Sequence, residues 1–405
     1  REYYWKGRAE SFAWDGKDGS GNRVPDGTYS YVVSAQDKAG NLTRKELKGL
    51  RVDTRPAPLY ITVSERAFSP NDDGDRDTVT FKPYVGLKEG IKSWTLTMVH
   101  EELGAQKTFK GGPVVPESIV WEGKVDRGAT APNGIYHGLM QVEYFKGNLP
   151  TAKTTTFRLD TLPPKVDITL SPVPFSPDND GVDDELSISM RVEDISPINR
   201  WHLEIRDPVG NHFTSYSGRG EPTRTIIWHG ISDTGELVQS AEDYPLTFTI
   251  SDELGNTTRI EKTIKVDVLV IREGNRLKIS ISSIVFAPYT ADYLNVEEER
   301  RERNIATLKR LAEILKKYSA YRILIEGHAV MEYWDNPARA KREQEEELIP
   351  LSKARAEAVK NALVEYGIDS RRISTKGVGG AQPVVPHGDL ENRWKNRRVE
   401  FILIK

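Results

Sequence analysis

The stretch Ile323-Leu324-Ile325-Glu326-Gly327-His328-Ala329-Val330 decides the fold of the C-terminal third of the chain. Its apolar run, ended by Gly-His, is typical of a buried strand that stops at a turn. One helical pattern precedes it at 297–318, and another begins at Pro350 and ends at Gly367. Further strand patterns lie at 277–286, 372–376 and 399–404. This alternation of strands and helices predicts an α/β layer domain.

Two further blocks follow this stretch in a fixed order. Leu351-Ser352-Lys353-Ala354-Arg355-Ala356 comes first, and Asn396-Arg397-Arg398-Val399-Glu400 lies near the end. Together with Gly327-His328 they resemble the OmpA-like peptidoglycan-associating domain, whose pattern runs Gly-His-Thr-Asp, then Asn-x-x-Leu-Ser-x-x-Arg-Ala, then Asn-Arg-Arg-Val-Glu. The resemblance covers residues 275–405 and implies a mixed sheet with helices on one face.

The resemblance also implies a ligand, the peptide stem of peptidoglycan. In that family the Asp of Gly-His-Thr-Asp meets the ammonium of diaminopimelate, and the Arg of Leu-Ser-x-x-Arg-Ala meets its carboxylate. A guanidinium holds a carboxylate in a two-bond fork, and a carboxylate offers an ammonium both charge and acceptors. The family positions that are retained here are Asn396, Arg355, Arg397 and Arg398.

Three polar positions of that pocket are apolar in this chain. The family Thr, Asp and Asn correspond to Ala329, Val330 and Leu348. Losing one partner of a buried recognition pair costs ~2–5 kcal/mol. We therefore expect that the domain has lost ordinary diaminopimelate binding and docks another envelope component, either a protein or a polymer.

An insertion offers a second interpretation. Residues 331–347 make the span between the first two blocks about ten residues longer than in the family, and they include a charged, helix-like stretch at 338–347. Glu332 or Asp335 would replace the missing carboxylate, with Arg355 retained, to fit a different diamine such as ornithine. Arg355 also has a plainer interpretation, a salt bridge on the helix surface to Glu357.

An enzyme belongs to a different functional class. His328 with Glu326 or Asp389 would suit acid–base chemistry, but no nucleophile motif or metal-ligand spacing accompanies them. We predict no catalytic activity and no cofactor, and treat a peptidoglycan-acting enzyme as the least favoured alternative.

Upstream, the sequence repeats every 107 residues. Trp14-Asp15-Gly16, Trp121-Glu122-Gly123 and Trp228-His229-Gly230 are evenly spaced, and Phe68-Ser69-Pro70 and Phe175-Ser176-Pro177 share the same period. Short alternating segments separated by Gly, Asn, Asp and Pro turns predict β-sandwiches. They resemble bacterial Ig-like modules of the flagellar-hook-cap and gliding-motility kind. We expect a partial module at 1–57 and complete modules at 58–164 and 165–271, so the fold class is multidomain.

The first module lacks part of the repeat, because its Phe-Ser-Pro would fall at position −39 (68 − 107), upstream of Arg1. We expect either additional residues upstream or a half-sandwich that leans on its neighbour. The repeated tryptophan is expected to be a core anchor and not a sugar-stacking platform.

The loops after each Phe-Ser-Pro are rich in aspartate. Oxygen-rich clusters can hold calcium, and the candidate ligands are Asp73, Asp75, Asp77, Asp180, Asp183 and Asp184. The EF-hand pattern fails, since Thr80 or Ser187 stands where its bidentate Glu belongs. The favoured interpretation is a turn in which Asp and Asn side chains accept backbone N–H groups.

The composition of the chain limits the classes of partner that it can bind. The 405-residue chain has a net charge of −3, which gives no electrostatic basis for binding nucleic acid. It contains no cysteine and no apolar run long enough to cross a bilayer. We expect a bacterial envelope protein in the periplasm or at the periplasmic face of the outer membrane. Its expected partner is peptidoglycan or an envelope protein, with any outer-membrane anchor lying upstream.

Overall fold

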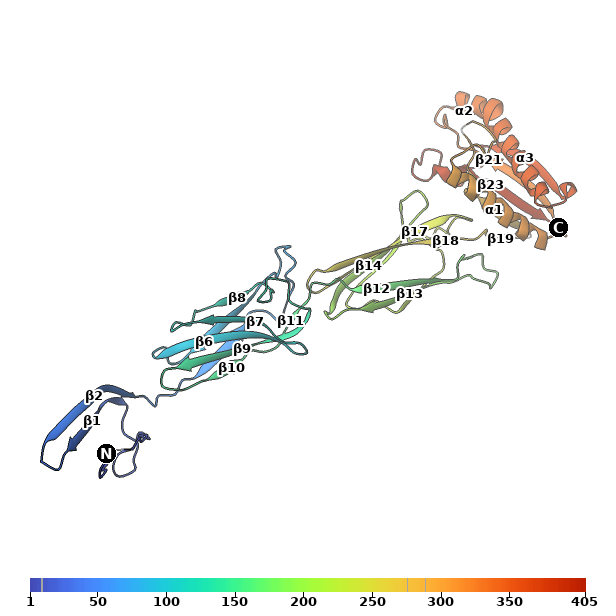
Figure 1. Ribbon diagram of the computed structural model, residues 1–405. Helices are drawn as coiled ribbons and strands as arrows, with labels where there is room; N and C mark the ends of the chain where they lie inside the picture. The colour runs from blue at the N-terminus through green and yellow to red at the C-terminus, as the bar shows by residue number, and fades with distance from the viewer. Residues whose placement is uncertain (9, 275, 288) are drawn as a thin grey trace. The chain divides into compact units, whose positions relative to one another are not determined.

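The computed structural model describes residues 1–405 except positions 9, 275 and 288 (Figure 1). Two compact units divide the chain, Arg1–Leu162 and Pro163–Lys405. None of the described helices has the length and apolar character needed to cross a bilayer.

The first unit begins with one antiparallel pair, β1 (Gly27–Gln36) and β2 (Leu42–Val52). Most side chains on these strands are exposed. Val33 is 42% exposed, whereas Met140, which lies 107 residues later in the repeat, is completely buried. Within the described residues, the face of β1 that carries Val33 therefore lacks the second sheet that covers the same face of the next repeat.

The rest of this unit is a sandwich of two sheets with a shared core that includes Trp121 and Tyr136. One sheet has the order β3-β5-β8, and the other β4-β11-β9-β6-β7 with β10 beside β9. The strands are β3 (Leu59–Val63), β4 (Ala67–Phe68), β5 (Val79–Val85), β6 (Ile91–His100), β7 (Gly104–Gly111), β8 (Ile119–Trp121), β9 (Gly134–Tyr144), β10 (Thr151–Lys153) and β11 (Phe157–Leu159).

The second unit opens with a similar sandwich, with the sheets β12-β13-β16 and β15-β14-β17-β18. Trp228 and Phe248 lie in its core. The strands are β12 (Lys165–Ser171), β13 (Leu186–Glu193), β14 (Ile198–Arg206), β15 (His212–Arg219), β16 (Thr225–Trp228), β17 (Asp243–Asp252) and β18 (Thr257–Lys265).

The repeated tryptophans share one local geometry. The indole Nε1 of Trp14, Trp121 and Trp228 donates to the carbonyl oxygen three residues later, at 2.7, 2.9 and 2.9 Å. Trp121 and Trp228 are 1% and 2% exposed, and Trp14 is half-buried. The expected core role therefore holds for the two complete sandwiches, where a large apolar ring is buried and its single polar atom is satisfied.

The C-terminal domain is a five-stranded mixed sheet in the order β19-β20-β23-β21-β22. Only β21 and β22 are parallel among these pairs. The strands are β19 (Ile271–Glu273), β20 (Arg276–Ile281), β21 (Arg322–His328), β22 (Ile373–Gly379) and β23 (Val399–Ile404). The predicted strand at 277–286 ends earlier than expected, at Ile281.

Two long helices, α1 (Glu298–Lys317) and α3 (Ile349–Glu365), cover one face of this sheet (Figure 1). Leu311 of α1 and Leu363 of α3 share a core with alternate residues of the central strands, such as Ile325 and Phe401. Because side chains alternate across a strand, the intervening residues of β21 and β23 point to the opposite face.

The helix expected to open at Pro350 is α3, which begins at Ile349 and contains this proline in its first turn. α2 (Pro337–Glu343) runs into a π-helical turn, Gln344–Leu348, which continues directly into α3. The combined helical segment is capped at its start by Asn336, whose side chain accepts the Arg339 N–H at 3.2 Å. Pro337 lies in the first turn of α2 and Pro350 in the first turn of α3, the helix position that proline favours. The second of these starts was predicted from the sequence, and the first was missed.

Within the second unit, the sandwich contacts the C-terminal domain through ion pairs. Arg310 binds Asp267 in a two-bond fork, with distances of 2.9 and 2.6 Å. Arg303 lies 3.4 Å from Glu242, a carboxylate that is 6% exposed. Burial raises the pKa of Glu242 to about 7, against the opposing effect of Arg303.

Candidate functional site

The end of β21 lies directly against the first turns of α3. A Cβ on Gly327 would sit 2.1 Å from the Ser352 carbonyl oxygen, and one on Gly377 would sit 2.3 Å from the Ile349 carbonyl oxygen. Only glycine permits this close backbone approach. The Ser352 hydroxyl then accepts the Gly379 N–H at 3.0 Å, which fixes the helix start over the strand ends.

Backbone hydrogen bonds continue the sheet beyond the last residue of β21. The His328 N–H donates to the Arg398 carbonyl at 2.9 Å, and the Ala329 N–H donates to the Gly379 carbonyl at 2.8 Å. In the antiparallel register Gly327 pairs with Val399, so Ala329 lies opposite Arg397 and shares its face, the helix-covered one.

Arg355 lies one helical turn beyond Ser352. Its Nε donates to the Thr290 carbonyl at 3.0 Å, and its guanidinium lies over the Phe286 ring, 5.0 Å from the centroid. Burial, and then the charge of Arg397, lower the pKa of Arg355. Among the described residues, no acidic side chain forms an ion pair with Arg355 or Arg397. The site therefore presents two neighbouring cations without a protein counter-charge.

The alternative partner of Arg355, Glu357, is engaged elsewhere. Its carboxylate accepts the Thr375 hydroxyl and lies 3.8 Å from Lys360. The salt bridge on the helix surface that would have given Arg355 a purely structural role is thus not formed in the described structure.

The substituted positions are apolar in their surroundings as well as in type. Ala329 and Leu348 are 5% and 8% exposed, and Val330 is half-buried. A Cβ built on Gly380 would lie 3.4 Å from Leu348 Cδ1 and 3.0 Å from Met331 Cβ. These side chains supply no acceptor for an ammonium group.

The two candidate replacement acids lie on the insertion. Glu332 and Asp335 are exposed, and no hydrogen bond or ion pair in the described part of the chain links either carboxylate to Arg355. A different acid of the insertion, Glu343, is 6% exposed and accepts the backbone N–H groups of Glu332 at 2.9 Å and Tyr333 at 3.0 Å. Sequence reasoning missed Glu343, because the charged run around it looks like a solvated helix face.

Gln344, another residue that the sequence did not single out, ties the insertion to β22. Its amide nitrogen donates to the Val378 carbonyl at 2.7 Å, and its amide oxygen accepts the Gly380 N–H at 2.7 Å. Together with Glu343, this side chain holds the insertion against the strand ends.

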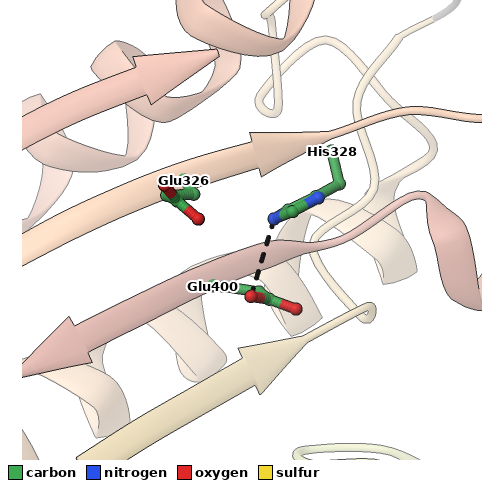
Figure 2. Close-up of side chains that lie close together, drawn as sticks. All are labelled: Glu326, His328 and Glu400. Carbon is green, nitrogen blue, oxygen red and sulfur yellow. Dashed lines mark ion pairs between the residues drawn. The ribbon is translucent and has the colours of Figure 1, made fainter. Parts of the chain in front are cut away.

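A second group of charged side chains lies on the opposite face of the sheet, where Glu326, His328 and Glu400 point toward one another (Figure 2). All three are at least 94% buried. His328 Nε2 lies 3.6 Å from a Glu400 oxygen, which is too long for a hydrogen bond.

Basic side chains neutralise these carboxylates. Arg398 Nε lies 2.6 Å and Lys278 Nζ 3.0 Å from Glu400, while Lys376 Nζ lies 2.8 Å from Glu326. Burial would raise the pKa of Glu400, but His328 and Arg398 bring it down to about 2. Although the three groups of Figure 2 are close enough to hold a metal ion, three cations already balance the two carboxylates. We interpret them as a structural ion network.

The acid–base pairing of His328 with Asp389 is not formed. His328 is 2% exposed and out of reach of a substrate, and Asp389 accepts the backbone and side-chain N–H groups of Asn392 at 3.1 and 2.9 Å. Asn396 is also a retained family position. Its side-chain oxygen accepts the Val384 N–H at 2.8 Å and so holds the loop that precedes Asn396. Of the three retained arginines, Arg355 and Arg397 are the two that have no acidic partner among the described residues; Arg355 does contact the Thr290 carbonyl and the Phe286 ring.

The aspartate-rich loops form turns held by carboxylates. Asp77 accepts the N–H groups of Asp72 and Gly74 at 2.7 and 2.8 Å, and Asp184 accepts those of Asn179 at 2.6 Å and Gly181 at 2.8 Å.

Other candidate calcium ligands in these loops serve the same purpose. Asp73 accepts from Asp75, and Asp180 from Val182, both at 2.8 Å, while Asp183 has a φ of 58°. Asp180 and Asp184 do come close to Asp178. The hydrogen bonds explain these residues as turn formers, and calcium binding stays an untested alternative.

Two parts of the chain match known protein families. Residues 301–397 match the OmpA family, and residues 6–39 match the FlgD Ig-like domain. Outer membrane porin F of Pseudomonas aeruginosa is 35% identical over 101 residues, 25% of this chain and 26% of that protein. Peptidoglycan-binding protein ArfA of Mycobacterium tuberculosis is 36% identical over 96 residues, 24% of this chain and 26% of that protein. This chain thus spans about a quarter of the length of these two relatives.

Among solved structures, the cell wall anchor of the T6SS from Pseudomonas aeruginosa is 27% identical, with 34% of this chain and 87% of that chain covered and a TM-score of 0.27. The OmpA family match and the order of the three sequence blocks identify the same C-terminal residues. Residues 301–397 of this chain form an OmpA family domain, and residues 6–39 are similar to part of the FlgD Ig-like domain.

Proposed function

We propose that this protein is a non-catalytic architectural component of the bacterial cell envelope, in which Ig-like modules act as a spacer and the C-terminal domain binds a carboxylate of peptidoglycan. The observation that carries the proposal is the pair of arginines, Arg355 and Arg397, that have no acidic partner among the described residues. Arginine is suited to fork-like binding of a carboxylate. The relative ArfA is named a peptidoglycan-binding protein, which supports the choice of polymer.

In this proposal, ordinary recognition of diaminopimelate is lost. The acid that would meet its ammonium is replaced by Val330, and Ala329 and Leu348 add no acceptor. Replacement by Glu332 or Asp335, for ornithine or another diamine, is the weaker alternative because neither carboxylate contacts the arginines in the described structure.

Binding to purified sacculi tests the proposal. The intact chain is expected to co-sediment with sacculi, and Arg355→Met is expected to weaken binding about 30-fold or more, as for the loss of one partner of a recognition pair. Arg371→Met is the matched control, because Arg371 is an exposed arginine of the same domain that pairs with Asp369 at 2.9 Å.

The two acids are tested in the same assay with sacculi of diaminopimelate and ornithine type. Loss of binding in Glu332→Ala or Asp335→Ala would establish the replacement hypothesis and contradict carboxylate capture by arginines alone. Failure of the unmodified chain to bind either type would overturn peptidoglycan binding itself.

A second candidate is docking to an envelope protein. The insertion exposes two aromatic side chains, Tyr333 at 46% and Trp334 at 52%, and aromatic residues are enriched at protein interfaces. If sacculi are not bound, crosslinking in periplasmic extract with a photoreactive residue at Trp334, compared with one at exposed Glu345, should yield a specific adduct. Equal labelling from both positions would argue against this surface.

A further inference from the structure

The last sandwich, which contains β12 to β18, and the C-terminal domain make a contact that lies outside the proposed ligand site. Both parts belong to the second compact unit, Pro163–Lys405. Ser240 of the sandwich forms a parallel bridge with Ile281, and its hydroxyl accepts the Leu269 N–H at 2.9 Å. The two parts are therefore docked on each other, and the charged side chains at the contact affect how strongly they hold together.

In two ion pairs of this contact, the acid has its own close basic partner. Arg310 holds Asp267 in a two-bond fork at 2.9 and 2.6 Å. Lys395 Nζ lies 2.6 Å from a Glu236 oxygen. An opposite charge this close favours the ionised form of an acid. These two pairs therefore need no proton to balance their charge.

Glu242 and Asp243 instead share a single base. Arg303 Nη2 lies 3.4 Å from Glu242 and 3.3 Å from Asp243. Glu242 is 6% exposed, and the Ser282 hydroxyl donates to its carboxylate at 3.3 Å. Both contacts are long for hydrogen bonds to a charged carboxylate. With both acids ionised, two negative charges would face one positive charge, and a proton on Glu242 would restore the balance.

The other charged or titratable groups around Glu242 do not supply this charge. Lys265 lies opposite Asp243 on β18, but it is exposed and forms no described ion pair with either acid. Burial raises the pKa of Tyr244, the next residue on β17, so its phenol stays neutral. Burial also raises the pKa of Glu242 to about 7; Arg303 opposes this rise and Asp243 adds to it. Of these groups, Glu242 is the one whose charge changes near neutral pH.

We propose that Glu242 makes this contact a proton-controlled latch: the last sandwich stays docked on the C-terminal domain while Glu242 is protonated, and the contact loosens when Glu242 ionises. Arg303 and Ser282, which contact the buried carboxylate, both belong to the C-terminal domain. Undocking would therefore return Glu242 to water and to its ordinary pKa. The joint between the two parts would be stiff in acid and able to bend at higher pH.

The direction of the pH dependence follows from this exchange. The pKa of Glu242 is about 7 in the docked state, above the ordinary value of 4.5, so docking takes up a proton. Docking is strongest below about pH 4.5 and weakens as the pH rises to about 7. The full difference corresponds to a docking equilibrium about 300-fold weaker in alkali than in acid.

Distance measurement between two spin labels by electron spin resonance tests the latch on the intact chain. The chain contains no cysteine, so Lys262→Cys on β18 and Lys309→Cys on α1 provide unique labelling sites, both at exposed positions. At pH 5 we expect one narrow distance distribution. At pH 8.5 we expect a second, broader population, with the ratio of undocked to docked molecules raised roughly 10²-fold.

Glu242→Gln is the decisive variant, because its neutral amide does not ionise. It is expected to keep the narrow distribution at both pH values. Glu221→Gln is the matched control at an exposed acid of the same sandwich, and it should respond to pH as the unmodified chain does.

Asp243→Asn guards against misfolding of Glu242→Gln. It leaves one arginine for one ionised carboxylate, so the response to pH should become smaller. An unchanged distribution of the unmodified chain between pH 5 and 8.5 would overturn the inference. A response that persists in Glu242→Gln, or one that becomes stronger in Asp243→Asn, would overturn it as well.

Discussion

Arg397 and Arg398 are neighbours in the sequence, yet they lie in opposite electrostatic surroundings. Arg398 is 6% exposed and bound to Glu400 at 2.6 Å, in a network with Lys278 and His328. Arg397 lies on the other face, exposed and close enough to Arg355 to lower its pKa. The charges around Glu400 are paired within the protein, whereas Arg355 and Arg397 have no acidic partner among the described residues, and this difference is the basis of the proposed ligand site.

The largest loss of stability is expected when the ion pairs of Glu400 are broken. Glu400→Leu would leave the buried guanidinium of Arg398 without its carboxylate partner, and an uncompensated buried charge costs about 3–5 kcal/mol. Urea denaturation of the intact chain, followed by a probe in the C-terminal domain, measures the loss. The double variant Glu400→Leu with Arg398→Met should recover part of it, and no recovery would mean that the cost arises from packing.

Glu242 is a buried carboxylate whose negative charge is less well balanced than that of Glu400. Among the described residues, Glu242 pairs with one basic side chain, Arg303, which is 40% exposed, and burial raises the pKa of Glu242 to about 7. Because the folded pKa lies above the ordinary value of 4.5, the group favours the folded state below about pH 4.5, and that contribution is lost as the pH rises to about 7.

The test of this prediction is Glu242→Gln. At pH 8 the substitution is expected to stabilise the second unit by about 3 kcal/mol, the value of a shift of this size, and at pH 4 it should have little effect. Thermal melts at both pH values measure the difference. A destabilisation at pH 8 would show that the ion pair with Arg303 outweighs burial.

A smaller effect is expected in the insertion. Glu343→Ala would leave the N–H groups of Glu332 and Tyr333 without their acceptor, at a cost of about 1–3 kcal/mol. Amide hydrogen exchange should rise at these two residues, with exposed Glu345→Ala as the unchanged control. Unchanged exchange would remove Glu343 from the support of the site.

The smallest change in stability is expected on the unpaired side. Arg355→Met loses the hydrogen bond to the Thr290 carbonyl and the contact with the Phe286 ring, but no described ion pair, and it relieves repulsion from Arg397. We therefore expect the free energy of unfolding to fall by only about 1 kcal/mol. Together with the sacculus assay, this variant separates binding from folding. A loss comparable with that of Glu400→Leu would mean that Arg355 is structural and would break the comparison.

The sequence predicted the elements that have strong periodic patterns. The strand at 399–404 and the glycine that ends α3 were both anticipated, and the repeat located the buried Trp121 and Trp228. Arg355 was singled out from its motif, and its role in binding stays a prediction.

The burial of two acids was not predictable. Glu343 lies against the backbone of the insertion and Glu242 at the contact between the sandwich and the C-terminal domain, and a charged residue in a polar run carries no signal of such burial. The π turn was equally hidden, since Pro350 reads locally as a helix start.

The contact between Gly327 and the Ser352 carbonyl also bears on how such a domain can change over time. The close contacts between α3 and the sheet are made by backbone atoms and glycines, whereas Ala329 and Val330, the positions that we propose set the ligand chemistry, lie just beyond them. Substitutions at the latter can therefore alter what is bound while the scaffold persists. A lineage can exchange one wall chemistry for another without passing through an unfolded ancestor.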